Sequence, residues 1–198
     1  MYVPKHFQVD EKEKLDAFIR SNSFGILFSN TESGPEANHL PFLLKDGFLY
    51  GHMAKINKQW EGLDGREVLV VFSGPHAYIS PTWYEEKDVV PTWNYAAVHV
   101  YGAFTPIHEG EELEWILRES VDFYEASMPQ PWKVDTGSDY FKRSLKAIVG
   151  FKIAVSRVEG KWKLSQNHSS ERREKVVRQL EKYEDDHSRQ IAKLMKES

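Results

Sequence analysis

Residues 43–53 read Leu-Leu-Lys-Asp-Gly-Phe-Leu-Tyr-Gly-His-Met, two apolar runs joined by a polar Lys45-Asp46-Gly47 turn. An Asp-Gly pair between such runs is a strong local signal for a β-hairpin. Other short runs rich in β-branched and aromatic residues surround it, separated by residue types that favour turns. The sequence therefore predicts antiparallel strands in a sheet that closes on itself, over residues 24–29, 37–44, 48–53, 68–73, 76–80, 97–105 and 149–158.

Helices are expected beside this sheet. Asp10 and Glu13 resemble a capping box at the start of a short helix with one apolar face. Apolar residues at helical spacing predict a second helix over residues 111–126. A third, short helix is expected near residues 139–146. From Ser170 onward the pattern predicts a charged amphipathic helix. Such a helix needs a partner surface, either the sheet or a second subunit.

Length and composition indicate one domain. At 198 residues, 40% of them hydrophobic, the chain can bury a core over residues 1–168, with the charged helix over residues 169–198 in the same domain or on a dimer partner. The net charge of −4 gives no general attraction to nucleic acid or anionic membranes, so direct DNA binding is not expected. Without cysteine or a membrane-spanning apolar run, the chain reads as a soluble cytoplasmic protein.

Several nucleotide-binding and catalytic motifs are absent from the sequence. No GxGxxG or GxxxxGK[ST] follows a predicted strand, which disfavours Rossmann and P-loop folds. Neither GxSxG nor HExxH occurs, and no serine or carboxylate pair is spaced for nucleophilic or acid–base catalysis. The eight histidines show no ligand spacing, so we predict neither a metal site nor a catalytic residue.

The segment 51–60 follows a predicted strand and places His52, Lys55 and Asn57 in or near a turn. A phosphate group prefers one or two cations and several N–H donors, and a turn at a strand end supplies both. These three residues are candidates for an anion site. The alternative interpretation is a solvated polar turn with Trp60 packed into the core.

Aromatic, histidine and amide residues are concentrated in three further runs, residues 74–84, 90–99 and 163–167. Side chains with a flat apolar face and a polar tip suit a planar ligand rich in nitrogen and oxygen, and they suit a protein interface equally well. The second run places Trp93 and Tyr95 just before a strand of small apolar residues. It is therefore either one wall of a cleft or a structural lid.

Six blocks of the chain resemble, in order and spacing, the PaiB family of FMN-binding negative transcriptional regulators. The blocks are residues 1–7, 39–42, 51–60, 74–81, 90–95 and 161–167. The resemblance covers about residues 1–181. It implies a six- to seven-stranded antiparallel Greek-key split barrel with flanking helices, like those of pyridoxamine-phosphate oxidases and flavin reductases, in a homodimer with FMN at the subunit interface.

The resemblance also implies roles for individual residues. His52, Lys55 and Asn57 are expected on the phosphate side of FMN, although the family often has arginine at the positions of Lys55 and His168. The residues expected to line the rest of the flavin are Trp93, Asn94, Tyr95, Lys163, Gln166 and Asn167.

The function implied by this resemblance is repression of extracellular protease synthesis and of sporulation. Because the chain is acidic, we expect such regulation to be indirect, through flavin or redox sensing or a protein partner. One alternative is a flavin-dependent oxidoreductase that uses NAD(P)H or acts on a haem-like substrate. Another is an interaction module without flavin, whose aromatic runs form the dimer interface.

Overall fold

In residues 1–31 and 34–198, which this computed structural model describes, eight strands form one sheet. The strands are β1 (Gln8–Val9), β2 (Phe24–Thr31), β3 (Gly34–Pro41), β4 (Leu43–Lys45), β5 (Phe48–Ala54), β6 (Glu67–Ile79), β7 (Thr92–Ile107) and β8 (Ile148–Lys163). Their order is β3-β2-β6-β7-β8-β5-β4, and β1 also pairs with β8. Every pair with a defined register is antiparallel, which agrees with the predicted mainly β fold.

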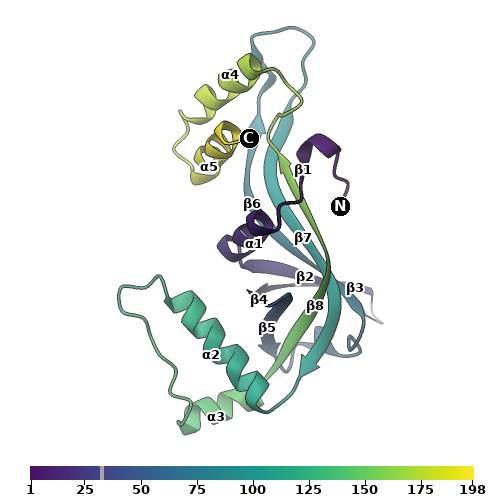
Figure 1. Cartoon of the computed structure of the whole chain (residues 1–198), viewed down its shortest axis with the longest axis vertical. Helices are drawn as coiled ribbons and strands as arrows, with labels where there is room; N and C mark the ends of the chain where they lie inside the picture. The colour runs from purple at the N-terminus through teal and green to yellow at the C-terminus, as the bar shows by residue number, and fades with distance from the viewer. Residues whose placement is uncertain (32–33) are drawn as a thin grey trace. The chain divides into compact units, whose positions relative to one another are not determined.

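Five α-helices accompany these strands in the described part of the chain (Figure 1). They are α1 (Lys12–Ser21), α2 (Glu111–Glu125), α3 (Asp139–Lys146), α4 (Ser170–Leu180) and α5 (Asp186–Lys196). The predicted second and third helices are confirmed, but the predicted C-terminal helix is two helices. Asp185 explains the interruption, because its carboxylate accepts a hydrogen bond from the Ser188 amide at 2.9 Å and begins α5 as an N-cap. No helix among the described residues is both long and apolar enough to cross a bilayer.

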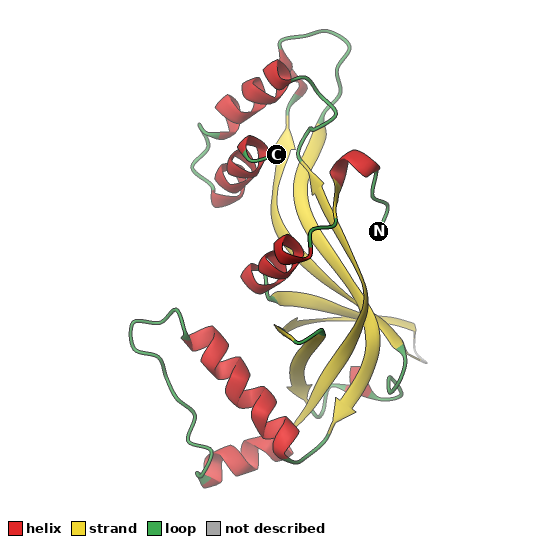
Figure 2. Ribbon diagram, viewed as in Figure 1, coloured by secondary structure: helices red, strands yellow, loops and turns green. Residues whose placement is uncertain are grey.

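The chain forms two compact units. The inner unit comprises Ile19–Phe72 and His99–Val158, and the terminal unit comprises Met1–Phe18, Ser73–Val98 and Glu159–Ser198. The three longest strands, β6, β7 and β8, each contribute residues to both units. Figure 2 distinguishes the strands from the helices and loops by colour.

Aromatic rings fill the core of the inner unit. Phe42 lies edge-on to Phe72 and to Phe151, with ring centroids 5.6 and 5.9 Å apart, and Phe104 stacks on Phe151 at 5.0 Å. All four rings are buried. Such ring pairs contribute about 0.5–1.5 kcal/mol each beyond the burial of apolar area. They join segments that are far apart in the sequence.

Helix α2 packs its apolar face on the strands of the inner unit. Leu113 and Ile116 form a buried cluster with Ile107 of β7. Gly150 of β8 permits this approach, because a Cβ at that position would lie 2.6 Å from Leu113 Cδ1. The helix is thereby held against the sheet, and its remaining face helps to frame a cavity.

Strand β6 corrects the prediction of two strands over residues 68–73 and 76–80. Gly74 and Pro75 were expected to form a turn, but a Cβ at Gly74 would lie 2.6 Å from the Phe18 ring, so the glycine permits close packing instead. The registered pairing of β2 with β6 reaches only Val71, so the missing amide hydrogen of Pro75 removes no bond from that pairing.

The number of strands also differs from the predicted six or seven. The predicted strand over residues 37–44 is divided into β3 and β4, with Phe42 between them, and the short β1 was not predicted. In addition, β7 begins at Thr92, so residues expected as a loop before that strand belong to it.

The terminal unit contains both ends of the chain. Strand β1 pairs with β8 through Gln8 and Val9. Helices α4 and α5 lie side by side, and α4 also contacts the short 3-10 helix Pro81–Tyr84 (Figure 1). Their apolar faces are buried, so much of the partner surface that these helices require lies within this unit. The buried residues are Val176, Val177, Leu180, Ile191, Ala192 and Met195.

Candidate functional site

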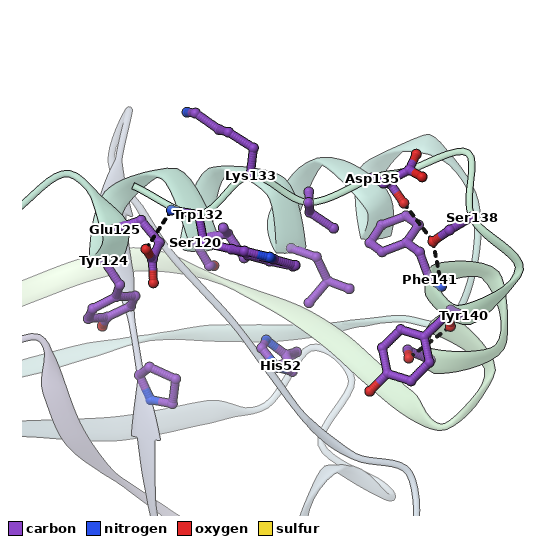
Figure 3. A pocket seen from close by; sticks show the side chains of 15 residues that line it. His52, Ser120, Tyr124, Glu125, Trp132, Lys133, Asp135, Ser138, Tyr140 and Phe141 are labelled. Carbon is purple, nitrogen blue, oxygen red and sulfur yellow. Dashed lines mark hydrogen bonds between the residues drawn. The ribbon is translucent and has the colours of Figure 1, made fainter. Parts of the chain in front are cut away.

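A cavity of about 590 Å³ lies in the inner unit, framed by α2, α3, the loop between them and strand β5 (Figure 3). This volume is within the range of pockets that hold small molecules and cofactors. Most of its wall is apolar or aromatic, which suits a flat ring system. The residues that matter most below are His52, Leu117, Tyr124, Trp132, Tyr140 and Phe141.

His52 supplies an unsatisfied polar atom to the cavity wall. Its Nδ1 is buried and makes no hydrogen bond with any residue that the structure describes. Burial lowers the pKa of His52 below its ordinary value of 6.5, so the imidazole is neutral at pH 7. Buried polar atoms in folded proteins nearly always have a partner. An unpaired nitrogen beside a cavity therefore favours a ligand that supplies one.

The loop between α2 and α3 is fixed over the cavity by local hydrogen bonds. The Glu125 carboxylate accepts the Trp132 amide proton at 2.7 Å, and Lys133 pairs with Asp122 at 2.5 Å. At the far end Ser138 caps α3 by accepting the Phe141 amide proton at 3.2 Å. These contacts hold the half-exposed Trp132 ring above His52 (Figure 3).

Of the three residues expected on the phosphate side, only His52 lines the described cavity. Lys55 and Asn57 lie in the turn that follows β5. The Lys55 amide donates to Ala147 O and the Asn57 amide to Ala54 O, both at 2.8 Å. These two backbone groups are therefore already used by the fold. Asn57 Oδ1 accepts the Gln59 amide proton, which leaves the exposed Lys55 ammonium and the Asn57 NH₂ group as anion donors.

A second cavity, of about 370 Å³, lies within the terminal unit. Two of the predicted site residues, Lys163 and Asn167, line it. The cavity is more polar than the first, and several of its side chains carry or accept a positive charge. The residues that matter most are Phe7, Tyr84, Lys163, Asn167, His168 and Arg172.

Asn94 and Gln166 use their amide groups inside the terminal unit. Asn94 is fully buried, donates to Ser165 Oγ at 3.0 Å and accepts from it at 3.2 Å. Gln166 accepts the Leu164 amide proton and donates to Trp162 O, both at 2.7 Å. Both side chains therefore stabilise the end of β8 and the turn after it.

Trp93 and Tyr95 lie on the opposite face of β7 from Asn94, because successive strand residues alternate between faces. Trp93 is 54% exposed and meets the exposed Tyr78 ring edge-on at 5.8 Å. Tyr95 packs under the Lys161 ammonium at 5.3 Å. The three predicted residues at the start of β7 therefore do not share one wall.

Comparison with known proteins identifies the family. Residues 1–157 match the family described as "Putative FMN-binding domain". The whole chain is also 41% identical, over 203 residues and 97% of that protein, to "Protease synthase and sporulation protein PAI 2" of Bacillus subtilis. The chain belongs to this FMN-binding family. The resemblance to the PaiB family is thereby confirmed, and FMN is supported as the cofactor that the sequence predicted.

More distant members and folds agree with this assignment. An uncharacterized protein of Aspergillus fumigatus is 31% identical over 92% of each chain. Among solved structures, the flavocytochrome Anf3 of Azotobacter vinelandii has a TM-score of 0.64 at 12% identity, covering 81% of this chain and 72% of that one. A FAD- and haem-binding protein of Mycobacterium smegmatis also scores 0.64, at 14% identity and with 84% and 78% coverage. At these identities the likeness establishes the fold alone.

The inner cavity fits the cofactor of the FMN-binding family. Its aromatic wall suits the flat face of a flavin, and the unpaired His52 nitrogen suits the polar atoms along a flavin edge. Lys55 follows His52 by three residues and carries the charge that a phosphate requires. The residue types present in and beside this cavity therefore suit FMN.

Sequence reasoning missed the aromatic residues of this cavity. Tyr124, Trp132 and Phe141 belong to α2, α3 and their loop, which were predicted only as helices beside the sheet. One signal was present, because Trp132 lies between polar and proline residues in a segment that has no core to fill. An aromatic side chain in such a loop frequently contacts a ligand.

Proposed function

We propose that this protein binds FMN in the cavity of the inner unit and acts in the cytoplasm as a flavin-dependent regulator. The observation that carries the proposal is the unpaired buried nitrogen of His52 in an aromatic cavity of a chain that belongs to an FMN-binding family. Bound FMN would supply a reducible ring.

Each residue has a defined part in this proposal. Trp132 covers the ring and excludes water, and its position is maintained by the Glu125 hydrogen bond to its amide. His52 gives the ring edge a neutral hydrogen-bonding partner. Lys55 and the NH₂ group of Asn57 hold the phosphate, in line with the roles expected from the sequence.

We further propose that the active form is a homodimer. Trp93 and Tyr78 form an exposed aromatic pair on the terminal unit. Exposed aromatic side chains are enriched in protein interfaces. In the dimer this pair would cover the flavin of the partner subunit, together with Tyr95. The same unit also contains the other residues that the sequence analysis expects beside the flavin, Lys163, Gln166 and Asn167.

The regulatory part rests on the relative from Bacillus subtilis, whose name refers to protease synthesis and sporulation. We propose repression of these processes. With a net charge of −4 the chain has no general attraction to DNA, so the repression is indirect and responds to flavin or redox state. A gel shift with promoter DNA at nanomolar protein and physiological salt would contradict the indirect route.

Titration of ligand-free protein with FMN tests the proposed site. We expect binding, followed by flavin fluorescence, and a tenfold or greater loss of affinity in Trp132→Ala and in Lys55→Ala. Lys55→Ala should leave riboflavin binding unchanged, because riboflavin has no phosphate. Tyr183→Ala, an exposed aromatic residue of the terminal unit, is the matched control for Trp132→Ala. Unchanged FMN affinity in both site variants would refute the proposal.

An oxidoreductase is the second candidate function. It is favoured by the neutral His52 imidazole in the cavity, since such a group can hold or transfer a proton beside a reduced ring. Steady NAD(P)H oxidation that requires FMN and falls in His52→Asn would support this alternative, with or without a haem-like acceptor. Absence of turnover in the FMN-loaded protein would leave regulation as the function.

A further inference from the structure

The side chain of Lys163 points to a second ligand site, in the terminal unit. Lys163 is half-buried, and its ammonium donates to Thr92 Oγ1 and, at 2.7 Å, to Trp93 O. Both acceptors are neutral. Among the residues that the structure describes, no carboxylate lies within ion-pair distance of this ammonium. Burial, with a smaller effect from Lys161, lowers the pKa of Lys163. Keeping Lys163 charged at this position therefore costs free energy in the folded state.

The cavity beside Lys163 contains a second unsatisfied group. The Tyr84 side chain is only 2% exposed, and its hydroxyl lies near Ser165 without a well-formed hydrogen bond. Burial raises the pKa of this hydroxyl, which therefore remains a neutral donor. Lys163 and Tyr84 line the same cavity of about 370 Å³. An ammonium without a counter-charge and a hydroxyl without a well-formed hydrogen bond thus line one cavity.

The charges around Lys163 are largely paired or balanced. Arg172 forms a two-point ion pair with Glu86, at 2.8 and 2.5 Å, so these two charges largely cancel. Arg172 also lies 3.1 Å from His168 Nδ1, and burial, Arg172 and Lys163 together lower the pKa of His168. Asp88 is the one acid among the described residues that line this cavity. A small anion would give Lys163 the counter-charge that it lacks.

We propose that the terminal unit binds a small oxyanion of the phosphate class in this cavity, held by the Lys163 ammonium and the Tyr84 hydroxyl. Neutral His168 supplies a further hydrogen bond, and the Arg172–Glu86 pair fixes the position of His168. Phe7 closes the apolar side, since Lys163 lies over its ring at 5.9 Å. The site is separate from the proposed flavin cavity, and its residues all belong to the terminal unit.

Calorimetric titration of the full chain with inorganic phosphate, at constant ionic strength, tests this proposal. We expect saturable binding that weakens at least tenfold in Lys163→Gln and is largely restored in Lys163→Arg. Tyr84→Phe should weaken binding several-fold, because it removes one donor and keeps the ring. Lys152→Gln is the control, since Lys152 lies in the inner unit and pairs with Glu112. No saturable binding by the wild type, or equal affinity in Lys163→Gln, overturns the proposal.

Two sources of the anion are distinguished by a second titration. If FMN displaces phosphate, and Lys163→Gln weakens FMN but not riboflavin, the anion is the phosphate of a flavin, and Lys163 rather than Lys55 holds that phosphate. If phosphate binds equally with and without FMN, the anion is a free metabolite. Both results support the site. Trp132→Ala separates this inference from the proposed function, because it should weaken riboflavin binding while leaving phosphate binding unchanged.

Discussion

The Asn94 amide is fully buried, and its hydrogen bonds join β7 to the turn after β8. The sequence predicted Asn94 as a ligand contact because asparagine offers both a donor and an acceptor. The structure uses both groups on Ser165. Residue type alone could not separate these roles, since the same chemistry serves a ligand or a neighbouring strand.

Replacing Asn94 by alanine should therefore destabilise the fold. The Ser165 hydroxyl loses its partner, and we expect the free energy of unfolding to fall by about 1–3 kcal/mol in urea titration. Asn167→Ala is the control, because Asn167 is exposed, and it should change stability by less than about 0.5 kcal/mol. Equal stability of the two variants would show that the Asn94 hydrogen bonds contribute nothing.

His52 gives the protein a defined pH dependence. Burial lowers its pKa in the folded state, whereas the unfolded chain titrates near 6.5. Below pH 6.5 the unfolded state binds more protons, so the free energy of unfolding should decrease as the pH falls. Urea unfolding at pH 7.5 and 5.5 should show a smaller decrease in His52→Asn than in wild type. His39→Asn, at an exposed position of β3, should keep the wild-type decrease. If His52→Asn also kept the full wild-type decrease, the pH dependence could not be assigned to His52.

At the level of elements, Gly160 decides how α1 meets β8 in the terminal unit. A Cβ there would lie 2.3 Å from Leu15 Cδ2 and 2.8 Å from Val9 O. Both neighbours are part of packed structure, so neither can move freely.

Gly160→Ala should consequently reduce the free energy of unfolding by about 1–3 kcal/mol, the usual cost of overpacking. Gly137→Ala is the matched control, because the nearest atom to its new Cβ would be a side-chain oxygen 3.3 Å away. Thermal unfolding of both variants provides the comparison. A Gly160→Ala protein as stable as wild type would mean that α1 shifts without cost.

The sequence predicted α2 and α3 within a residue, and for α2 the prediction rested on apolar residues that recur at helical spacing. It failed at Gly74 and Pro75, where turn-forming residues lie inside a strand for a tertiary reason, the approach of Phe18. Local sequence patterns were also insufficient for the inner cavity, because tertiary packing brings its residues together. His52 was predicted from its local segment, but Trp132 and Tyr124 are brought to it only by the packing of α2 and its loop.

At the level of the whole molecule, family membership and the fold agree, and the homodimer is the next prediction. Sedimentation at micromolar protein should give a single dimeric species for the wild type. Trp93→Ser should shift it toward monomer, because Trp93 is 54% exposed and meets Tyr78 on the proposed interface. Trp132→Ser, another exposed tryptophan, should leave the dimer intact. A monomeric wild type would contradict the proposed dimer.

The central claim is that the inner cavity is the flavin site. A crystal structure of the protein with FMN tests it most directly. We predict electron density for the ring between Trp132 and His52, with the His52 nitrogen paired to the flavin and the phosphate beside Lys55. A flavin ring bound elsewhere, with the inner cavity unchanged, would contradict the account.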